Sequence, residues 1–291
     1  MYSSSRREFI RQSSLLTAGL FINKEEWFKS KKKIGIQLYT LRNEMGKDPK
    51  GTLQKVAQLG YKEVETFGYN KGKWFGLTAP ELKAVLKDNG LSSPSGHTFL
   101  ASIFLKDGWE DNWKKGVEDA KAIGQKYIVI PWLEEANRKP IDNYKKIADG
   151  LNKAALICKQ AGDIDVAYHN HDFEFFESDN QTGFDILMKE TDPMVKMELD
   201  LYWVVKAGKN PLDLFAAHPR RFVMWHVKDM DTTEKKFFTE VGNGSIDFKS
   251  IFAQAKLSGM KHFFVEQDFC PGPPLESIAK SIDYLKKNIV K

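Results

Sequence analysis

Four short segments of the sequence each end an apolar, β-branched or aromatic run with a residue that can bind a metal ion. The segments are IDVAYHNH (164–171), VKMELD (195–200), FVMWHVKD (222–229) and HFFVEQD (262–268). Their polar ends offer His169 and His171, then Asp200, His226 and Glu266. Imidazole and carboxylate groups are common protein ligands of divalent metals. These residues predict a metal site, provided that the fold brings them together.

The spacing of the segments indicates how the fold would do this. A helix-like stretch lies in each interval between them, so the segments recur as strand–helix units. In a parallel barrel of such units, the C-terminal ends of successive strands converge on one end, where the active sites lie. We therefore expect an α/β fold, a single (β/α)8 TIM barrel over residues 34–291.

The whole chain supports this architecture, because eight strand patterns alternate with helix patterns and no Pro/Gly/Ser-rich linker interrupts them. The expected strands are 34–41, 61–67, 91–97, 127–132, 164–171, 195–201, 222–228 and 262–267. The expected helices are 50–59, 79–89, 109–123, 141–161, 183–191, 211–217, 248–257 and 274–288. Neither a GxGxxG after the first strand nor a GxxxxGK[ST] is present, which argues against dinucleotide and P-loop sites.

Each candidate ligand also has an ordinary structural interpretation. A lone aspartate at the position of Asp200 commonly caps a helix or forms a loop salt bridge, and a lone histidine such as His226 is commonly a hydrogen-bonded core residue. Glu266 ends so apolar a run that its charge must be paired, solvated or metal-bound. Their shared register at the strand ends favours metal ligation for all three.

The tripeptide His169-Asn170-His171 places two imidazoles on the same side of one strand, with Glu174 nearby. We assign His169 to the metal and His171 to catalysis or to support of the ligands. The reverse assignment stays open at this point.

Further candidates come from the same strand-end positions. Lys228 shares a strand face with His226 and is expected to hold a substrate oxygen or to pair with Asp229. Glu65 and His97 lie at or near the ends of the second and third expected strands and are candidates for binding sugar hydroxyls. Flat walls for a sugar ring are predicted at Trp132 and Trp203, with weaker candidates at Tyr39 and Phe269; core or rim packing is the alternative for these aromatic residues.

The excess of positive charge lies in the N-terminal segment. The chain has 291 residues and a formal net charge of +5, but residues 1–33 contain eight Lys/Arg and three Glu, so the remainder is balanced. A neutral body argues against nucleic acid as a partner. We expect a small-molecule carbohydrate substrate instead, and the sequence is compatible with a homo-oligomer.

The first 33 residues have the pattern of an export signal. Arg6 and Arg7 precede a weakly apolar stretch over 13–22, which resembles a twin-arginine signal. The stretch is too short to span a membrane, so no stable membrane insertion is expected. We predict a periplasmic protein, or a cytoplasmic one if the leader is not functional. The two cysteines, Cys158 and Cys270, are expected to remain unpaired.

The order of these segments resembles the xylose isomerase-like TIM-barrel superfamily, the group of sugar phosphate isomerases and epimerases. The resemblance covers residues 34–290 and is carried by IGIQLYT (34–40), GYKEVE (60–65), YHNH (168–171), LD (199–200), HVKD (226–229) and VE (265–266). It implies one divalent ion, Mn²⁺, Co²⁺, Zn²⁺ or Mg²⁺, at the barrel mouth. By position, its four ligands would be His169, Asp200, His226 and Glu266.

One departure from the family pattern bears on the reaction. In ketose 3-epimerases of this family, a glutamate on strand five pairs with the glutamate on strand eight, and the two move a proton between opposite faces of a carbon. This chain has His169 at the strand-five position. A histidine-rich fifth strand is more similar to inosose dehydratase-type relatives, which eliminate water beside a ketone.

The resemblance therefore predicts a metal-dependent isomerase or epimerase of a keto-sugar, with a lyase or dehydratase of a keto-sugar or keto-glycoside as the alternative. Glu266 or His171 would be the base, and His171 or Lys228 would serve the departing oxygen. An exported enzyme would act on an unphosphorylated substrate. The non-enzyme alternative is a periplasmic carbohydrate-binding barrel, and a nuclease is disfavoured because the chain has six histidines and a neutral body.

Overall fold

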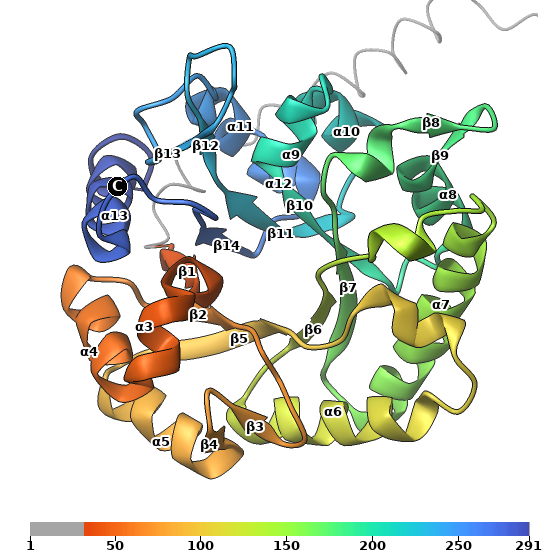
Figure 1. Ribbon diagram of the computed structural model, residues 1–291, viewed down its shortest axis with the longest axis horizontal. Coiled ribbons are helices and arrows are strands. Elements are labelled where there is room, and N and C mark those ends of the chain that lie inside the picture. Colours follow the sequence, from red (N-terminus) through yellow and green to blue (C-terminus); the bar gives the residue numbers. More distant parts are fainter. Residues whose placement is uncertain (1–31, 291) are drawn as a thin grey trace, which may run out of the picture.

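Eight parallel strands close into a barrel in a computed structural model that describes residues 32–290 (Figure 1). They are β1 (Gly35–Gln37), β2 (Glu63–Thr66), β5 (Ser92–His97), β6 (Tyr127–Ile130), β7 (Asp165–His169), β10 (Lys196–Asp200), β11 (Phe222–Val227) and β14 (His262–Val265). Each strand pairs with its neighbours in chain order, and β14 closes the ring against β1. The predicted TIM barrel is confirmed.

Helices surround the barrel on its outer side (Figure 1). The principal ones are α4 (Pro49–Leu59), α5 (Ala79–Asp88), α6 (Glu110–Ile123), α7 (Asn143–Ala161), α8 (Gly183–Glu190), α10 (Pro211–Ala217), α11 (Phe248–Ala253), α12 (Ala255–Ser258) and α13 (Pro274–Asn288). Their ends follow local sequence: Thr78 and Glu81 form a capping box at the start of α5, and Gly259 ends α12 in the left-handed conformation.

The strand register arranges the side chains inside the barrel in layers. Asp200 lies opposite His226 across β10 and β11, so both side chains reach the C-terminal mouth. Side chains two residues apart share a strand face, so the layer beneath is formed by the residues two positions earlier. There, Ala167, Met224 and Phe264 belong to a buried apolar cluster.

All eight expected strands and eight expected helical regions are present, with the strands shorter than predicted. The first strand ends at Gln37, where a 3-10 turn over Leu38–Leu41 begins. The expected helix 248–257 is broken at Gln254 into α11 and α12. Two short helices were not predicted, α3 (Arg42–Lys47) and α9 (Leu201–Lys206). The apolar residues of α9 directly continue the strand pattern, which hid the start of the helix.

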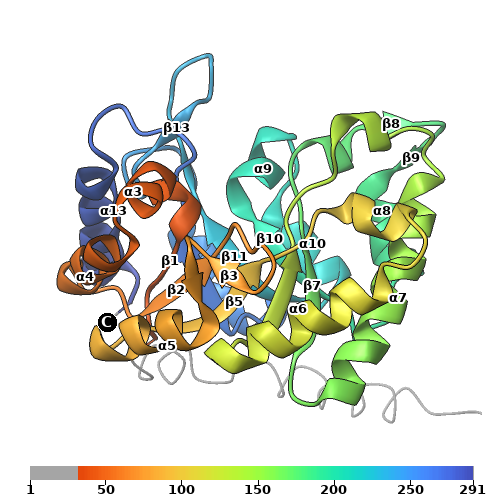
Figure 2. The same ribbon diagram turned by 60° about the horizontal axis from the view of Figure 1, so that its bottom comes forward.

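Three short hairpins lie outside the barrel: β3–β4 (Lys73–Trp74, Leu77–Thr78), β8–β9 (Glu177–Ser178, Gln181–Thr182) and β12–β13 (Asp229–Met230, Phe238–Thr239). Figure 2 shows α3, α9, β13 and the β8–β9 hairpin at the same end of the barrel.

Within residues 32–290, no helix is long and apolar enough to cross a membrane. Cys158 and Cys270 are both free, as expected. The predicted export signal lies outside the described residues, so it stays a prediction.

Candidate metal centre and active site

His226 stands at the centre of the barrel mouth and presents its two ring nitrogens to two different groups of side chains. It is the last residue but one of β11, a strand that is buried along its whole length, and it is fully buried itself. Nδ1 faces Asp200 and Glu266, whereas Nε2 faces Glu65 and Glu198. We call these sets the mouth group (His169, Asp200, His226 and Glu266) and the deep group (Glu65, His97, Glu198 and His226).

The mouth group contains the four residues that the sequence predicted as metal ligands. His169 Nε2 lies 3.2 Å from Asp200 Oδ2, and His226 Nδ1 lies 3.8 Å from the same oxygen. His226 Nδ1 is 2.6 Å from Glu266 Oε2. One ligand atom from each residue falls within 4.8 Å of all the others. The structure thus brings the predicted set together; its occupation by a metal stays a prediction.

The donor atoms of the mouth group fit a divalent ion. His226 Nδ1 and Glu266 Oε2 are both buried and neither has a hydrogen-bond partner of normal geometry within the described residues, although they are close together. Once His226 loses the proton on Nδ1, this nitrogen and the facing carboxylate oxygen would be two donor atoms for a shared cation. Two imidazoles and two carboxylates are a ligand set that Zn²⁺, Co²⁺ and Mn²⁺ accept.

Neighbouring groups hold these ligands in orientation. The carbonyl of Pro131 lies 3.2 Å from His169 Nδ1, so a proton on Nδ1 would leave Nε2 free as a ligand. Asp200 Oδ1 accepts a hydrogen bond from the Trp203 backbone N–H, which caps α9. The Asp200 N–H in turn donates to the Asn170 side chain.

Lys228 is the buried cation of the mouth. Its ammonium lies 3.0 Å from Asp200 Oδ2, 2.8 Å from Glu266 Oε2 and 3.1 Å from Asp268 Oδ1. Burial alone would lower the pKa of Lys228, but the charge of Asp200 and the other carboxylates raises it well above its ordinary value. Lys228 therefore remains an ammonium.

The expected pairing of Lys228 with Asp229 does not occur. Asp229 is buried and accepts backbone hydrogen bonds from Gly242, Gly244 and Ile246 instead. Its carboxylate thus organises the chain after β12.

Asp268 belongs to the site and was not predicted. It follows Glu266 by two residues, so an extended chain would carry it on the same face, and this was the available signal. Burial raises the pKa of Asp268 to about 6. The pKa of Glu266 is shifted in the other direction. Burial would raise it, but the charges of Lys228 and His226 hold it well below its ordinary value. Asp268 is therefore the better proton carrier of the two.

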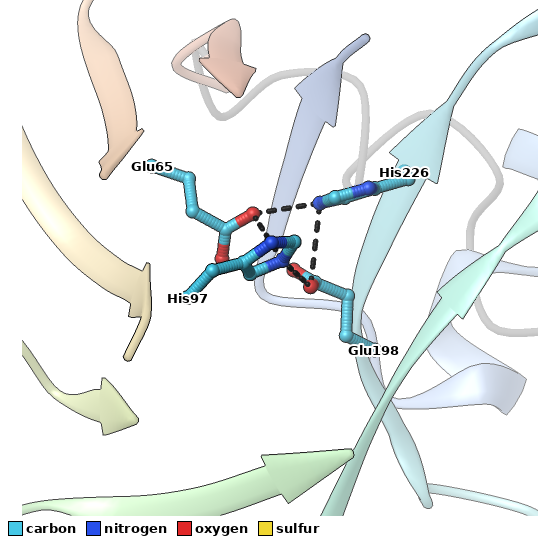
Figure 3. Close-up of side chains that lie close together, drawn as sticks. All are labelled: Glu65, His97, Glu198 and His226. Atoms are coloured by element: carbon cyan, nitrogen blue, oxygen red, sulfur yellow. Dashed lines mark hydrogen bonds and ion pairs between the residues drawn. The ribbon is translucent and has the colours of Figure 1, made fainter. Parts of the chain in front are cut away.

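The deep group lies beneath the mouth (Figure 3). His226 Nε2 is 2.6 Å from Glu65 Oε2 and 3.3 Å from Glu198 Oε2, and His97 Nε2 is 3.3 and 3.0 Å from the same two oxygens. Glu198 was missed, although its position two residues before Asp200 places it on the same strand face.

Glu65 and His97, both predicted to bind sugar hydroxyls, take different places. Glu65 is fully buried and does not line the mouth cavity, so its position gives that role no support. His97 lines the cavity, with 11% of its side chain exposed.

His171 lines the cavity and is held between aromatic rings. Its ring stacks on Phe173 and meets Trp132 edge-on, with centroids 5.4 and 4.5 Å apart. Burial, together with the neighbouring His169, lowers the pKa of His171 well below its ordinary value, so the ring is neutral near pH 7. Its Nδ1 is buried with no hydrogen-bond partner within residues 32–290. A neutral imidazole of this kind is suited to accept a proton.

The mouth opens into a cavity of about 730 Å³. Its walls are largely aromatic, and they include all four aromatic residues that the sequence proposed as walls, Tyr39, Trp132, Trp203 and Phe269. Two arginines stand at the cavity, Arg42 over the Tyr39 ring and Arg138 over the Phe173 ring. A cavity of this size and character suits a sugar-sized ligand.

Comparisons with known proteins agree with this arrangement. The family described as xylose isomerase-like TIM barrel matches residues 53–288. Inosose dehydratase of Clostridium botulinum is 28% identical over 271 residues, which is 81% of this chain and 88% of that protein. Inosose dehydratase of Geobacillus kaustophilus is 26% identical over 69% of this chain and 74% of that protein. A crystal structure of a sugar phosphate isomerase/epimerase from Parabacteroides distasonis has a TM-score of 0.78 and 27% identity, covering 90% of this chain and 96% of that one.

Proposed function

Because this chain belongs to the xylose isomerase-like TIM-barrel family, we propose that it is a divalent-metal-dependent lyase acting on a keto-sugar or related keto-polyol. It would eliminate water or an alcohol. The departing oxygen is bound to the β-carbon, two bonds from the carbonyl carbon. His169, Asp200, His226 and Glu266 would hold the ion. When bound, the ion would polarise the substrate carbonyl and stabilise negative charge on its oxygen.

The observation that carries this proposal is the presence of two unlike proton carriers at the cavity. His171 follows β7 and is a neutral imidazole, whereas Asp268, a carboxyl group with its pKa raised to about 6, lies beside the Lys228 ammonium near β11 and β14. Elimination needs an acceptor for the proton on carbon and a donor for the departing oxygen. These two sides of the cavity offer one of each.

The residue roles follow from these charges. His171 takes the proton from the carbon next to the carbonyl, so the C–H bond breaks and a C=C bond forms. The C–O bond at the neighbouring carbon breaks, its electron pair leaves with the oxygen, and Asp268 in its protonated form supplies the proton that this oxygen takes. Lys228 stays protonated and offsets negative charge on oxygen. Glu266 is assigned to the ion and not to proton removal, because its carboxylate already faces Lys228 and His226, which hold its pKa well below its ordinary value against the effect of burial.

The second candidate is the isomerase or epimerase that the sequence favoured. The name of the Parabacteroides distasonis structure supports it, and both reactions begin with the same proton removal. The names of the Geobacillus and Clostridium relatives support elimination. An unphosphorylated, periplasmic substrate is proposed from the leader alone.

One experiment separates these reactions. The full chain, loaded with Mn²⁺ or Co²⁺, is incubated in D₂O with a panel of keto-sugars, inososes and 3-keto-glycosides, and the products are followed by mass spectrometry and NMR. Loss of water or release of an alcohol supports the lyase. Formation of an epimer or isomer that carries deuterium from the solvent, without loss of water or an alcohol, supports the second candidate. Binding without any reaction would leave a carbohydrate-binding barrel.

A further inference from the structure

Below the mouth, four ionisable side chains converge inside the barrel, and His226 is the only one of them that the proposed reaction uses. They are the members of the deep group, carried by β2, β5, β10 and β11 (Figure 3). We propose that the deep group is a second divalent-metal site, and that His226 joins it to the mouth group by binding one ion through each ring nitrogen. This inference does not rest on the reaction proposed above.

The geometry of the deep group matches a four-coordinate site. Two imidazole nitrogens alternate with two carboxylate oxygens around a ring of contacts, at separations of 2.6, 3.3, 3.0 and 3.3 Å. A tetrahedral ion with bonds of about 2.0–2.1 Å holds its ligand atoms roughly 3.3 Å apart. Side chains from four different strands thus approach the spacing that such an ion would impose.

The position of Glu198 is hard to explain without a cation. The equivalent positions on three other strands, two residues before the mouth ligand, are the apolar Ala167, Met224 and Phe264. Glu198 is fully buried in this layer, and so is the facing Glu65. Two buried carboxylates side by side are costly unless a positive charge lies between them, and the imidazolium of His226 is shared with Glu266 of the mouth group.

Hydrogen bonds from the two histidines do not satisfy these carboxylates. His97 and His226 each approach the same pair of oxygens through Nε2, so they bring at most one proton apiece to four contacts. Oε1 of Glu65 and Oε1 of Glu198 are buried with no hydrogen-bond partner within residues 32–290. A divalent ion would neutralise both carboxylates, with His97 as a neutral ligand and with His226, once it also binds the ion of the mouth group, as a bridging imidazolate.

The surroundings of the deep group also suit an ion. Lys228 is directed to Asp200, Glu266 and Asp268 of the mouth, and none of its ion pairs reaches Glu65 or Glu198. The Gln37 side chain donates a hydrogen bond of 2.7 Å to Glu65 Oε2, which fixes the carboxylate as supporting residues do around bound metals.

Metal stoichiometry tests this inference. The full chain is stripped of metal with a chelator, titrated with Mn²⁺ or Co²⁺ by equilibrium dialysis and analysed by elemental mass spectrometry. Wild type is expected to bind about two equivalents. Glu65→Gln/His97→Gln should bind about one, and so should His169→Gln, which alters only the mouth group. Circular dichroism and thermal unfolding establish that each variant is folded.

Two results overturn the deep site. In the first, wild type saturates at one equivalent of metal, and only His169→Gln loses it. In the second, a folded Glu65→Gln/His97→Gln variant binds as much metal as wild type. The first result leaves the proposed lyase standing. A third result is one equivalent of metal that is lost in Glu65→Gln/His97→Gln and retained in His169→Gln. This result supports the deep site and removes the metal from the proposed reaction.

A spectroscopic readout needs no variant. Two Mn²⁺ ions joined through His226 would be magnetically coupled, so the electron paramagnetic resonance spectrum of wild type at saturation should differ from that of protein loaded with a sub-stoichiometric amount. A spectrum of isolated Mn²⁺ at every loading would overturn the bridge.

Discussion

His226 Nδ1 lies 2.6 Å from Glu266 Oε2, yet the two atoms do not form a hydrogen bond of normal geometry. A cation bound between the two atoms would interact with both of them. Lys228 Nζ is 2.8 Å from the same glutamate oxygen, which shows how strongly this point attracts positive charge. The following predictions start from this relationship.

Glu266→Gln should weaken binding of Mn²⁺ at the mouth by at least about 100-fold, because residues that merely support metal ligands contribute 10–100-fold. Metal affinity measured by competition with a chelator checks this. Glu276→Gln, an exposed position at the start of α13, is the matched control and should bind Mn²⁺ as wild type does. Unchanged affinity in Glu266→Gln would remove this residue from the metal site.

Lys228→Met should destabilise the metal-free protein by about 3–5 kcal/mol, since it leaves three carboxylates around one buried point without their cation. Saturating Mn²⁺ should reduce this loss, because the ion supplies the missing positive charge. Urea unfolding with and without Mn²⁺ measures both effects.

Lys126→Met is the control for Lys228. Lys126 pairs with Asp163 on the surface, where an ion pair contributes at most about 1 kcal/mol. Equal losses of stability in the two variants would show that the ion pairs of Lys228 contribute no more than a surface ion pair does.

His171→Gln should lower kcat by about 10²–10⁴-fold without loss of bound metal, as expected for removal of a general base. Steady-state kinetics on the substrate identified by the panel, with metal analysis of the same preparation, checks this. His218→Gln, which packs near Phe184 and Phe222 and does not line the cavity, is the control. Normal kcat in His171→Gln would move the base to another residue.

Glu174 makes stability depend on pH. Its carboxylate accepts hydrogen bonds from the Tyr168 hydroxyl and the His171 N–H, yet burial raises its pKa to about 7 from an ordinary 4.5. The folded state thus holds a proton that the unfolded state releases above pH 4.5. The stabilisation is complete below that pH and is lost as the pH rises through 7, by about 3 kcal/mol in total.

Urea unfolding between pH 5 and 8 compares wild type with Glu174→Gln, which cannot titrate. The stability of wild type relative to Glu174→Gln should fall across this range, whereas Glu177→Gln, at an exposed position nearby, should follow wild type. A constant difference between wild type and Glu174→Gln would show that Glu174 keeps an ordinary pKa.

Trp132→Ala should raise KM by up to about tenfold and change kcat little, because the ring would stack on the sugar and take no part in proton transfer. The ring lines the cavity with 37% of its surface exposed. Phe176→Ala removes an exposed ring that does not line the cavity and should leave KM unchanged. An equal effect of the two substitutions would remove Trp132 from the substrate wall.

The barrel and the mouth group were predictable because both depend on short-range pattern. Apolar runs define the eight strands, and a polar residue at the end of such a run lies at the mouth whatever the connecting loops do. His169, Asp200, His226 and Glu266 share this position, so the sequence was sufficient to group them.

The remaining parts of the site depend on depth and on neighbours far along the chain. Glu198 resembles an ordinary strand residue until the closed barrel buries it against Glu65, more than a hundred positions away. The partners of Lys228 are likewise set by the path after β14, which brings Asp268 back to β11. Helix α9 was hidden because its apolar residues extend the preceding strand pattern.

Asp200 connects the ligand set to the cavity wall through a single side chain. One oxygen faces the mouth, and the other fixes the first turn of α9, which carries Trp203. A designer who wishes to change the substrate of this scaffold therefore cannot move that wall without disturbing the ligand. The segment over 132–140 carries Trp132 and Arg138 and begins after Pro131, whose carbonyl orients His169, so it is the more promising place to diversify specificity.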